Sequence, residues 1–250
     1  MSKRGSYVYG VHPVGELLRS RPEDVHRVYF VQTAKSGRFF EIERAAHKHK
    51  IQVVGLSRTQ LEDLVGSVNH QGIAAAVESF RYAELEDVLS QHAGAAPLLV
   101  ALDQIQDPHN LGAIIRSAFA LGAQGVVIPK DRACEITPTV VKASAGATSH
   151  LPVIRVTNLN RALHDMREAG LWIYGLAAEG DRNLYDEELV GPTVLVVGSE
   201  GQGLRRMIAE SCDRLLRIPM LGELGSLNAS VAAGVALYEA ARQRNLRQSK

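Results

Sequence analysis

Three short segments of the chain contain the side chains best suited to bind or transform a ligand. The first places Asn110 and Arg116 after an apolar run, and the second places Glu200 in a glycine-rich turn. The third places Ser226 and Asn228 before a helix rich in Ala, Gly and Val. Together they supply amide, hydroxyl, carboxylate and guanidinium groups, which can orient a substrate and stabilise developing charge.

Each of these segments alone also has a purely structural explanation. Arg116 lies among isoleucine, alanine and phenylalanine side chains, so it needs an anionic or carbonyl partner, which a structural ion pair also provides. Ser226 and Asn228 are favourable helix N-cap residues, and Asn110 can cap the helix that we expect to begin near it. The single segments therefore leave capping and catalysis equally open.

The glycine-rich turn lies at the end of the apolar run 194–197. Gly198, Gly201 and Gly203 allow backbone N–H groups to approach a ligand closely. The turn lacks the third glycine of the Rossmann fingerprint and the GK[ST] of a P-loop. Glu200 would repel a phosphate, and it suits a cation or a hydroxyl group instead. This argues against a nucleotide-phosphate loop.

The bulk composition restricts the class of protein. The chain has 250 residues, of which 46% are hydrophobic and 22% charged, as in a globular domain with a well-buried core. No apolar run approaches the roughly 18 residues of a membrane span, and the N-terminus lacks a signal-peptide pattern. Cys134 and Cys212 have no metal-binding spacing, so we expect inert packing residues, no metal and a cytoplasmic location.

The charge is unevenly distributed although the net charge is only +1. Residues 1–80 contain 11 Lys and Arg against 8 Asp and Glu, and residues 81–250 contain 17 against 19. Five of the nine histidines also lie in the first segment. This pattern favours an anionic partner for the N-terminal part weakly, and a solvated surface explains it almost as well.

The order of apolar and polar runs predicts a small N-terminal α/β domain over residues 1–80, a linker over 81–97 and a larger domain over 98–250. In the first domain we expect helices at 12–20, 39–50 and 58–65 and strands at 25–31, 51–56 and 73–77. In the second we expect strands at 98–103, 125–129, 153–156, 171–176, 193–198 and 215–218. Helices at 110–121, 137–147, 158–169, 204–211 and from about 230 onward would separate or follow them.

Near-continuous apolar strands alternating with helices predict a parallel sheet covered on both faces. Ligands of such α/β sheets bind outside the carboxyl ends of the strands. All three polar segments follow predicted strands, so we expect them to meet at this edge.

The three segments, read in order, carry a specific resemblance. They are N-L-G-x-x-x-R, then V-x-G-x-E-G-x-G-L, then I-P-M followed by S-L-N-A-S. With DPHNLG, IPKDRA, VIRVTNL and the N-terminal YGVHPVGELL and NHQGI, the chain closely resembles the SpoU (TrmH-like) branch of the SPOUT RNA 2′-O-methyltransferases. The bacterial 23S rRNA guanosine 2′-O-methyltransferases are the most similar group, and the resemblance covers nearly the whole chain.

This resemblance implies an S-adenosylmethionine-dependent enzyme that works as a homodimer on 23S ribosomal RNA. It implies a deep trefoil knot in the C-terminal domain and an N-terminal RNA-binding domain similar to ribosomal protein L30e. The positions that match the family's catalytic and substrate residues are Asn110, Arg116, Glu200, Ser226 and Asn228. The positions that match its S-adenosyl-L-methionine contacts are Gly198, Ile218, Met220 and Leu227.

Two roles for Arg116 remain open at this stage. The family's arginine has been regarded as a general base, but a guanidinium pKa above about 12 favours a phosphate clamp that also stabilises alkoxide charge. The alternatives for the whole chain are a tRNA or antibiotic-resistance rRNA 2′-O-methyltransferase and a non-catalytic RNA-binding ribosome-assembly protein. A Rossmann nucleotide enzyme is disfavoured by the missing fingerprint.

Overall fold

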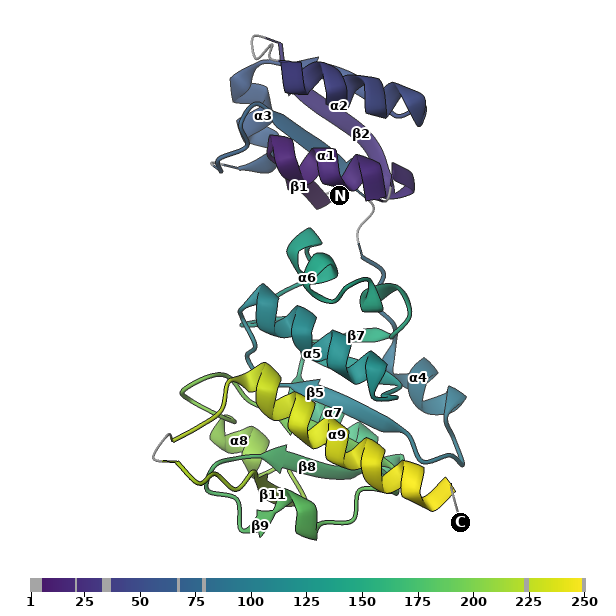
Figure 1. Ribbon diagram of the computed structural model, residues 1–250, viewed down its shortest axis with the longest axis vertical. Helices are drawn as coiled ribbons and strands as arrows, with labels where there is room; N and C mark the ends of the chain where they lie inside the picture. Colours follow the sequence, from purple (N-terminus) through teal and green to yellow (C-terminus); the bar gives the residue numbers. More distant parts are fainter. Residues whose placement is uncertain are drawn as a thin grey trace. The chain divides into compact units, whose positions relative to one another are not determined.

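A computed structural model describes residues 6–20, 22–32, 37–66, 68–77, 80–222 and 225–248. The chain forms two compact units, Met1–Arg81 and Tyr82–Lys250 (Figure 1). Residues 223 and 224, within the polar turn before the last helix, lie outside the described residues.

The N-terminal unit is built on a four-stranded mixed sheet in the order β1-β4-β2-β3. β2 pairs with β3 in parallel, whereas β4 pairs antiparallel with both β1 and β2. The strands are β1 (Ser6–Tyr9), β2 (Val25–Val31), β3 (Gln52–Leu56) and β4 (Ile73–Val77). The short edge strand β1 is the one strand of this sheet that the apolar pattern did not predict, because four residues give too little alternation.

Helices cover both faces of this mixed sheet. The helices are α1 (Val11–Ser20), α2 (Gly37–Lys48) and α3 (Arg58–Val65), with a 3-10 turn at Pro22–Asp24. Leu18 and Ile42 pack into one buried cluster, and Leu61 packs into another with Val31 and Ala74. Ser57 caps α3, because its side chain accepts a hydrogen bond from the Gln60 backbone in a capping box.

The C-terminal unit contains a seven-stranded sheet in the order β7-β6-β5-β10-β8-β11-β9, in which every neighbouring pair is parallel. This confirms the predicted α/β class. Its strands are β5 (Leu98–Leu102), β6 (Gly125–Pro129), β7 (Val153–Val156), β8 (Trp172–Leu176), β9 (Arg182–Asn183), β10 (Thr193–Val197) and β11 (Arg214–Arg217). All residues of β5, β6 and β10 are buried, as their apolar runs predict.

Helices cover both faces of the parallel sheet (Figure 1). The helices are α4 (Leu85–Gln91), α5 (Pro108–Ala120), α6 (Pro138–Ala143), α7 (Leu159–Glu168), α8 (Arg206–Ala209) and α9 (Ala229–Gln248), with 3-10 turns at Ala147–Ser149 and Leu184–Asp186. On one face α4, α7 and α8 pack onto a common core with the sheet. On the other face α5 and α9 lie side by side.

Residues 81–97, which the sequence predicts as a linker, contain the helix α4. Leu85 and Val88 of this helix are buried in the core of the C-terminal unit, and Ala83 forms a bridge to Ile154. The segment therefore packs as part of that unit. The assignment of separate functions to residues 1–80 and 98–250 stays a prediction.

The expected helix start at Asn110 is wrong by two residues. α5 begins at Pro108, and the Asp107 side chain caps it by accepting a hydrogen bond from the His109 backbone. Proline at the first helical position loses no helical hydrogen bond there, which favours this earlier start. The Asn110 side chain is consequently free for another contact.

Candidate active site

Asn110, Glu200 and Asn228 form one hydrogen-bonded cluster, although 118 residues separate the first from the last. The Asn110 amide donates to Glu200 Oε1 at 2.8 Å, and the Asn228 amide donates to Asn110 Oδ1 at 3.0 Å. The Asn228 amide also donates to the same Glu200 oxygen. The predicted meeting of the three segments is thus confirmed by direct contacts.

Asn228 both caps a helix and takes part in this cluster. Its Oδ1 accepts from the backbone N–H groups of Ser230, at 2.9 Å, and Val231, at 3.2 Å, in the first turn of α9. Its amide nitrogen points the other way, toward Asn110 and Glu200. The capping and ligand-facing interpretations of this residue are therefore compatible, because its oxygen and nitrogen serve different partners.

The turn that carries Glu200 is held by tight backbone packing. Ser199 and Gly203 exchange two backbone hydrogen bonds, of 3.1 and 2.9 Å, which close the turn. A Cβ atom added at Gly198 would overlap the backbone of Gly203 and Leu204, so only glycine fits there. Gly201 and Gly203 adopt positive φ angles of 78° and 66°. The glycines therefore shape the turn from which Glu200 projects.

An ion pair between the buried Asp103 carboxylate and the partly exposed Arg205 anchors the end of this turn, and the sequence did not predict it. Asp103 is fully buried at the carboxyl end of β5. It accepts from the Arg205 backbone N–H at 2.9 Å and from the Arg205 Nε at 2.8 Å. An acidic residue directly after an apolar run was the available signal, because a carboxylate buried there requires a partner.

Arg116 and Ser226 do not join the cluster. Both side chains are exposed, and neither makes a hydrogen bond or ion pair with any residue that the structure describes. Arg116 lies six residues after Asn110, which is about 9 Å further along the helix axis and on another face of α5. The structural ion pair considered for Arg116 is accordingly absent from the described part of the chain.

The residues predicted for the cofactor lie on two loops of the C-terminal unit, one after β10 and one between β11 and α9. Gly198 is buried at the end of β10, whereas Ile218, Met220 and Leu227 are half-buried after β11 and before α9. Residues 218–222 form no backbone hydrogen bond with other residues that the structure describes. Half-buried backbone groups need partners, so this segment offers donors, acceptors and apolar side chains to a ligand.

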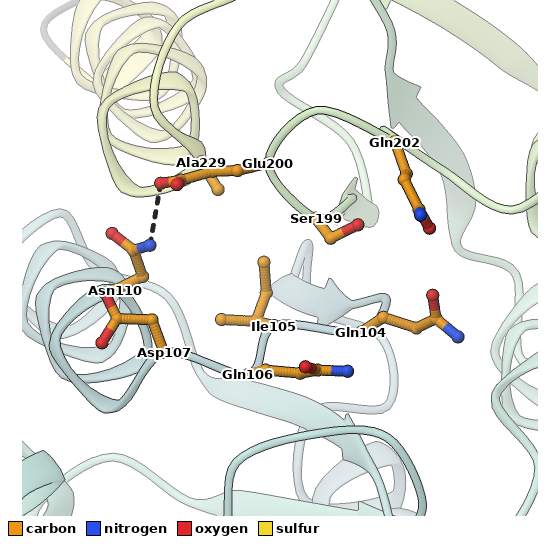
Figure 2. Close-up of a pocket in the computed structure, with 9 residues that line it drawn as sticks. All are labelled: Gln104, Ile105, Gln106, Asp107, Asn110, Ser199, Glu200, Gln202 and Ala229. Carbon is orange, nitrogen blue, oxygen red and sulfur yellow. Dashed lines mark hydrogen bonds between the residues drawn. The ribbon is translucent and has the colours of Figure 1, made fainter.

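A cavity of about 290 Å³ opens beside the cluster (Figure 2). Asn110 and Glu200 lie at one end of it, joined by their hydrogen bond. The cavity lies at the carboxyl edge of the sheet, where α/β proteins bind ligands. Its lining residues are Gln104, Ile105, Gln106, Asp107, Asn110, Ser199, Glu200, Gln202 and Ala229.

Neither Cys134 nor Cys212 has the properties of a reactive thiol. Burial raises the pKa of the Cys212 thiol to about 12, and burial also raises the pKa of the Cys134 thiol. Both shifts favour the protonated, unreactive thiol at neutral pH. Among the described residues no group of three or more His, Cys, Asp or Glu side chains is arranged to hold a metal ion.

Comparison with known proteins identifies the family. The model of the SpoU rRNA Methylase family matches residues 97–238, more than half of the chain. The chain belongs to the SpoU family. A second model, described as the RNA 2′-O ribose methyltransferase substrate-binding domain, matches residues 7–83. The SpoU match contains every predicted site residue, and the substrate-binding match covers almost the whole N-terminal unit.

Similar SpoU relatives align along their full length. The chain is 45% identical over 247 residues to the 23S rRNA (guanosine-2′-O-)-methyltransferase RlmB of Xanthomonas axonopodis pv. citri, covering 98% of this chain and 99% of that protein. It is 40% identical over 241 residues to RlmB of Vibrio vulnificus, covering 95% and 97%.

Solved structures of the family share the fold. The SpoU methyltransferase AviRb from Streptomyces viridochromogenes, in complex with AdoMet, matches with a TM-score of 0.64 and 29% identity. That match covers 96% of this chain and 90% of AviRb.

Proposed function

We propose that this protein transfers the methyl group of S-adenosylmethionine to the ribose 2′-oxygen of a guanosine in 23S ribosomal RNA. The observation that carries this proposal is the cluster of Asn110, Glu200 and Asn228, which three distant segments bring to one cavity. The full-length similarity to RlmB proteins supports the choice of reaction and RNA. A ribosomal RNA substrate also supports our proposal of a cytoplasmic location.

The residues present fit S-adenosylmethionine. Residues 218–222 and Leu227 offer backbone groups and half-buried apolar side chains, and Gly198 keeps the neighbouring turn close to the sheet. We propose that Gly198, Ile218, Met220 and Leu227 hold the cofactor within the predicted trefoil knot. When bound, the cofactor supplies a methyl group already activated by a positively charged sulfur.

The protein then has to orient the ribose and assist loss of the 2′-hydroxyl proton. Glu200 accepts two amide hydrogen bonds on one oxygen, Oε1, which fixes its carboxylate and leaves the other oxygen for a ribose hydroxyl. Holding the hydroxyl in line with the methyl group supplies much of the acceleration. Asn110 and Asn228 thus act by orienting Glu200 and the nucleotide.

Arg116 is assigned the role of a phosphate clamp. Its exposed guanidinium has no partner among the described residues, and it can grip an RNA phosphate with paired N–H groups. An arginine is a poor general base because its pKa lies above about 12. Ser226, exposed before α9, completes the set by contacting the nucleotide.

We propose further that the protein is a homodimer. Val231, Val235 and Tyr238 repeat along one face of α9 and are 50%, 39% and 62% exposed. Phe119 of the adjacent helix α5 is 46% exposed. A second copy covering this aromatic and aliphatic stripe would remove it from water.

The N-terminal unit is proposed to bind the RNA. The match of the substrate-binding model to residues 7–83 and the excess of basic residues in this part of the chain support that role. Deleting residues 1–80 is expected to weaken RNA binding while leaving binding of S-adenosylmethionine intact. Unchanged RNA affinity and unchanged choice of site in the truncated protein would contradict this assignment.

The direct test is methyl transfer from labelled S-adenosylmethionine to deproteinised 23S rRNA, with tRNA in parallel, followed by mild alkaline hydrolysis. A 2′-O-methyl group removes the nucleophile for strand cleavage, so a modified position appears as a gap in the ladder. We expect one gap, at a 23S guanosine. Methyl transfer only to tRNA would show that the substrate is tRNA. Failure to bind S-adenosylmethionine would favour the alternative of a non-catalytic RNA-binding ribosome-assembly protein.

A further inference from the structure

The cavity beside the cluster has two chemically different ends. Asn110 and Glu200 occupy one end, and the other end is lined by the carboxamides of Gln104, Gln106 and Gln202. In Figure 2 these amides lie on the side away from Asn110, and the Gln202 side chain extends from its loop toward Gln104. If the ribose lies at the Glu200 end, the rest of the nucleotide extends toward the three amides.

The three glutamine side chains are available to a ligand. None of them forms a side-chain hydrogen bond with any residue that the structure describes. Gln106 and Gln202 are exposed, and Gln104 is half-buried. Each carboxamide therefore has donors and acceptors open to a ligand in the same cavity.

The backbone of Gln104 is held in an unusual conformation. Its φ angle is 60°, in the left-handed region that costs a non-glycine residue about 1–2 kcal/mol. Such backbone strain in non-glycine residues is concentrated at binding and catalytic sites. Gln104 directly follows the buried Asp103, whose ion pair with Arg205 joins the two loops that carry Gln104 and Gln202.

The chemistry at this end fits a nucleobase. Carboxamides are neutral and offer both donors and acceptors, as does the hydrogen-bonding edge of a base. Charged groups would be expected for a phosphate, and the three amides supply none. The volume, about 290 Å³, lies at the lower limit of ordinary small-molecule pockets, which suits one nucleotide.

We propose that Gln104, Gln106 and Gln202 form the pocket for the base of the methylated nucleotide and that they determine which base is accepted. This inference rests on the proposed function, because it needs an RNA nucleotide whose ribose lies at Glu200. None of the residues that we assign to S-adenosylmethionine lines the cavity.

The test measures discrimination between bases. Short 23S rRNA transcripts carry the guanosine mapped by the hydrolysis ladder, or adenosine, cytidine or uridine in its place. The wild-type protein is compared with Gln104→Gly, which removes the amide but suits the left-handed backbone, and with Gln202→Ala. Ala145→Gly is the matched control, because Ala145 also has a positive φ, of 50°, but does not line the cavity.

We expect each glutamine variant to lower kcat/KM for guanosine by about 10-fold, the value of one hydrogen bond, while the rates for the other bases change little. The preference for guanosine would then fall by the same factor, and Ala145→Gly would keep it. The dissociation constant of S-adenosylmethionine, measured by calorimetry, would stay unchanged in all three variants.

Two results would overturn the inference while leaving the proposed function intact. One is a loss of rate that is equal for all four bases. The other is a weakening of cofactor binding that matches the loss in kcat/KM, which would assign the amides to the adenine of S-adenosylmethionine. By contrast, a wild-type protein that methylates no RNA would refute the proposed function first and this pocket with it.

Discussion

The two units of the chain build their sheets in different ways, and only one of these ways gathers distant side chains at a single site. In the N-terminal unit β4 runs antiparallel to both of its neighbours, so its carboxyl end lies at the opposite edge of the sheet from those of β1, β2 and β3. In the C-terminal unit all neighbouring strands are parallel. Their carboxyl ends therefore share one edge.

The consequence is visible in the order of the site residues. Asn110 follows β5, Glu200 follows β10 and Asn228 follows β11, and the three meet at one end of the sheet. The N-terminal unit has no comparable cluster among its described residues, and its match is to a substrate-binding model. This comparison supports our proposal that the C-terminal unit performs catalysis and the N-terminal unit supplies RNA affinity.

The largest expected effect comes from the turn that projects Glu200. A Cβ at Gly198 would overlap backbone atoms, so Gly198→Ala should displace the turn and lower methyl transfer by well over about 100-fold, as loss of a preorganised group does. Gly201→Ala is the matched control, since its Cβ would meet open space and only its φ of 78° is strained. Equal rates in the two variants, measured by single-turnover transfer, would contradict this account.

The next effect concerns Arg116. Arg116→Lys keeps the positive charge but loses the planar fork, so kcat should fall at least about 100-fold if the arginine stabilises the transition state. Because Arg116 is exposed and unpaired within the described residues, thermal unfolding should be unchanged. A nearly normal kcat would exclude both the clamp and the base.

A smaller effect is expected from Asp103, which anchors the same turn from the neighbouring strand. Asp103→Asn keeps the shape but removes the charge that pairs with Arg205, and it should destabilise the C-terminal unit by about 2 kcal/mol. Hydrogen exchange should accelerate in β5 and β10 while β2 and β4 remain protected. Uniform acceleration in both sheets would mean that the two units unfold together.

The smallest expected effects are losses of stability when a helix cap is removed from one unit or the other. Ser57→Ala removes the cap of α3, and Thr137→Ala removes the cap of α6. Each should cost about 1 kcal/mol of stability. The loss should be confined to the unit that contains the helix, as read by hydrogen exchange in each sheet. Ser57→Ala should leave kcat unaltered. A drop in kcat would show that α3 affects the rate of methyl transfer.

Much of the local structure followed from the sequence. The buried strands were predicted because continuous apolar runs can be satisfied only between two layers of helices. The helix at 58–65 was predicted at its observed bounds, Arg58–Val65. The motifs around Asn110, Glu200 and Asn228 identified the family. The predicted parallel sheet indicated that these residues would meet at the carboxyl edge of its strands.

Other features depended on contacts between residues far apart in the chain. Asp107 replaced Asn110 as the cap of α5, which freed the Asn110 amide to bind Glu200, 90 residues away. Asn228 caps α9 with its oxygen and binds the cluster with its nitrogen, and sequence rules treat these roles as alternatives. The short edge strands β1 and β9 are formed by pairing with neighbours rather than by their own apolar pattern.

The sequence by itself determined the α/β class, the family and the three residues Asn110, Glu200 and Asn228 that the structure brings into contact. Local propensity and motif spacing are properties of neighbouring residues, so they are readable without a structure. Only the tertiary structure decided which of those residues touch, that Asp103 and Arg205 anchor the turn, and that three glutamines line one end of the cavity. Partners of buried charges and the shape of a cavity depend on packing between distant segments, which no local pattern records.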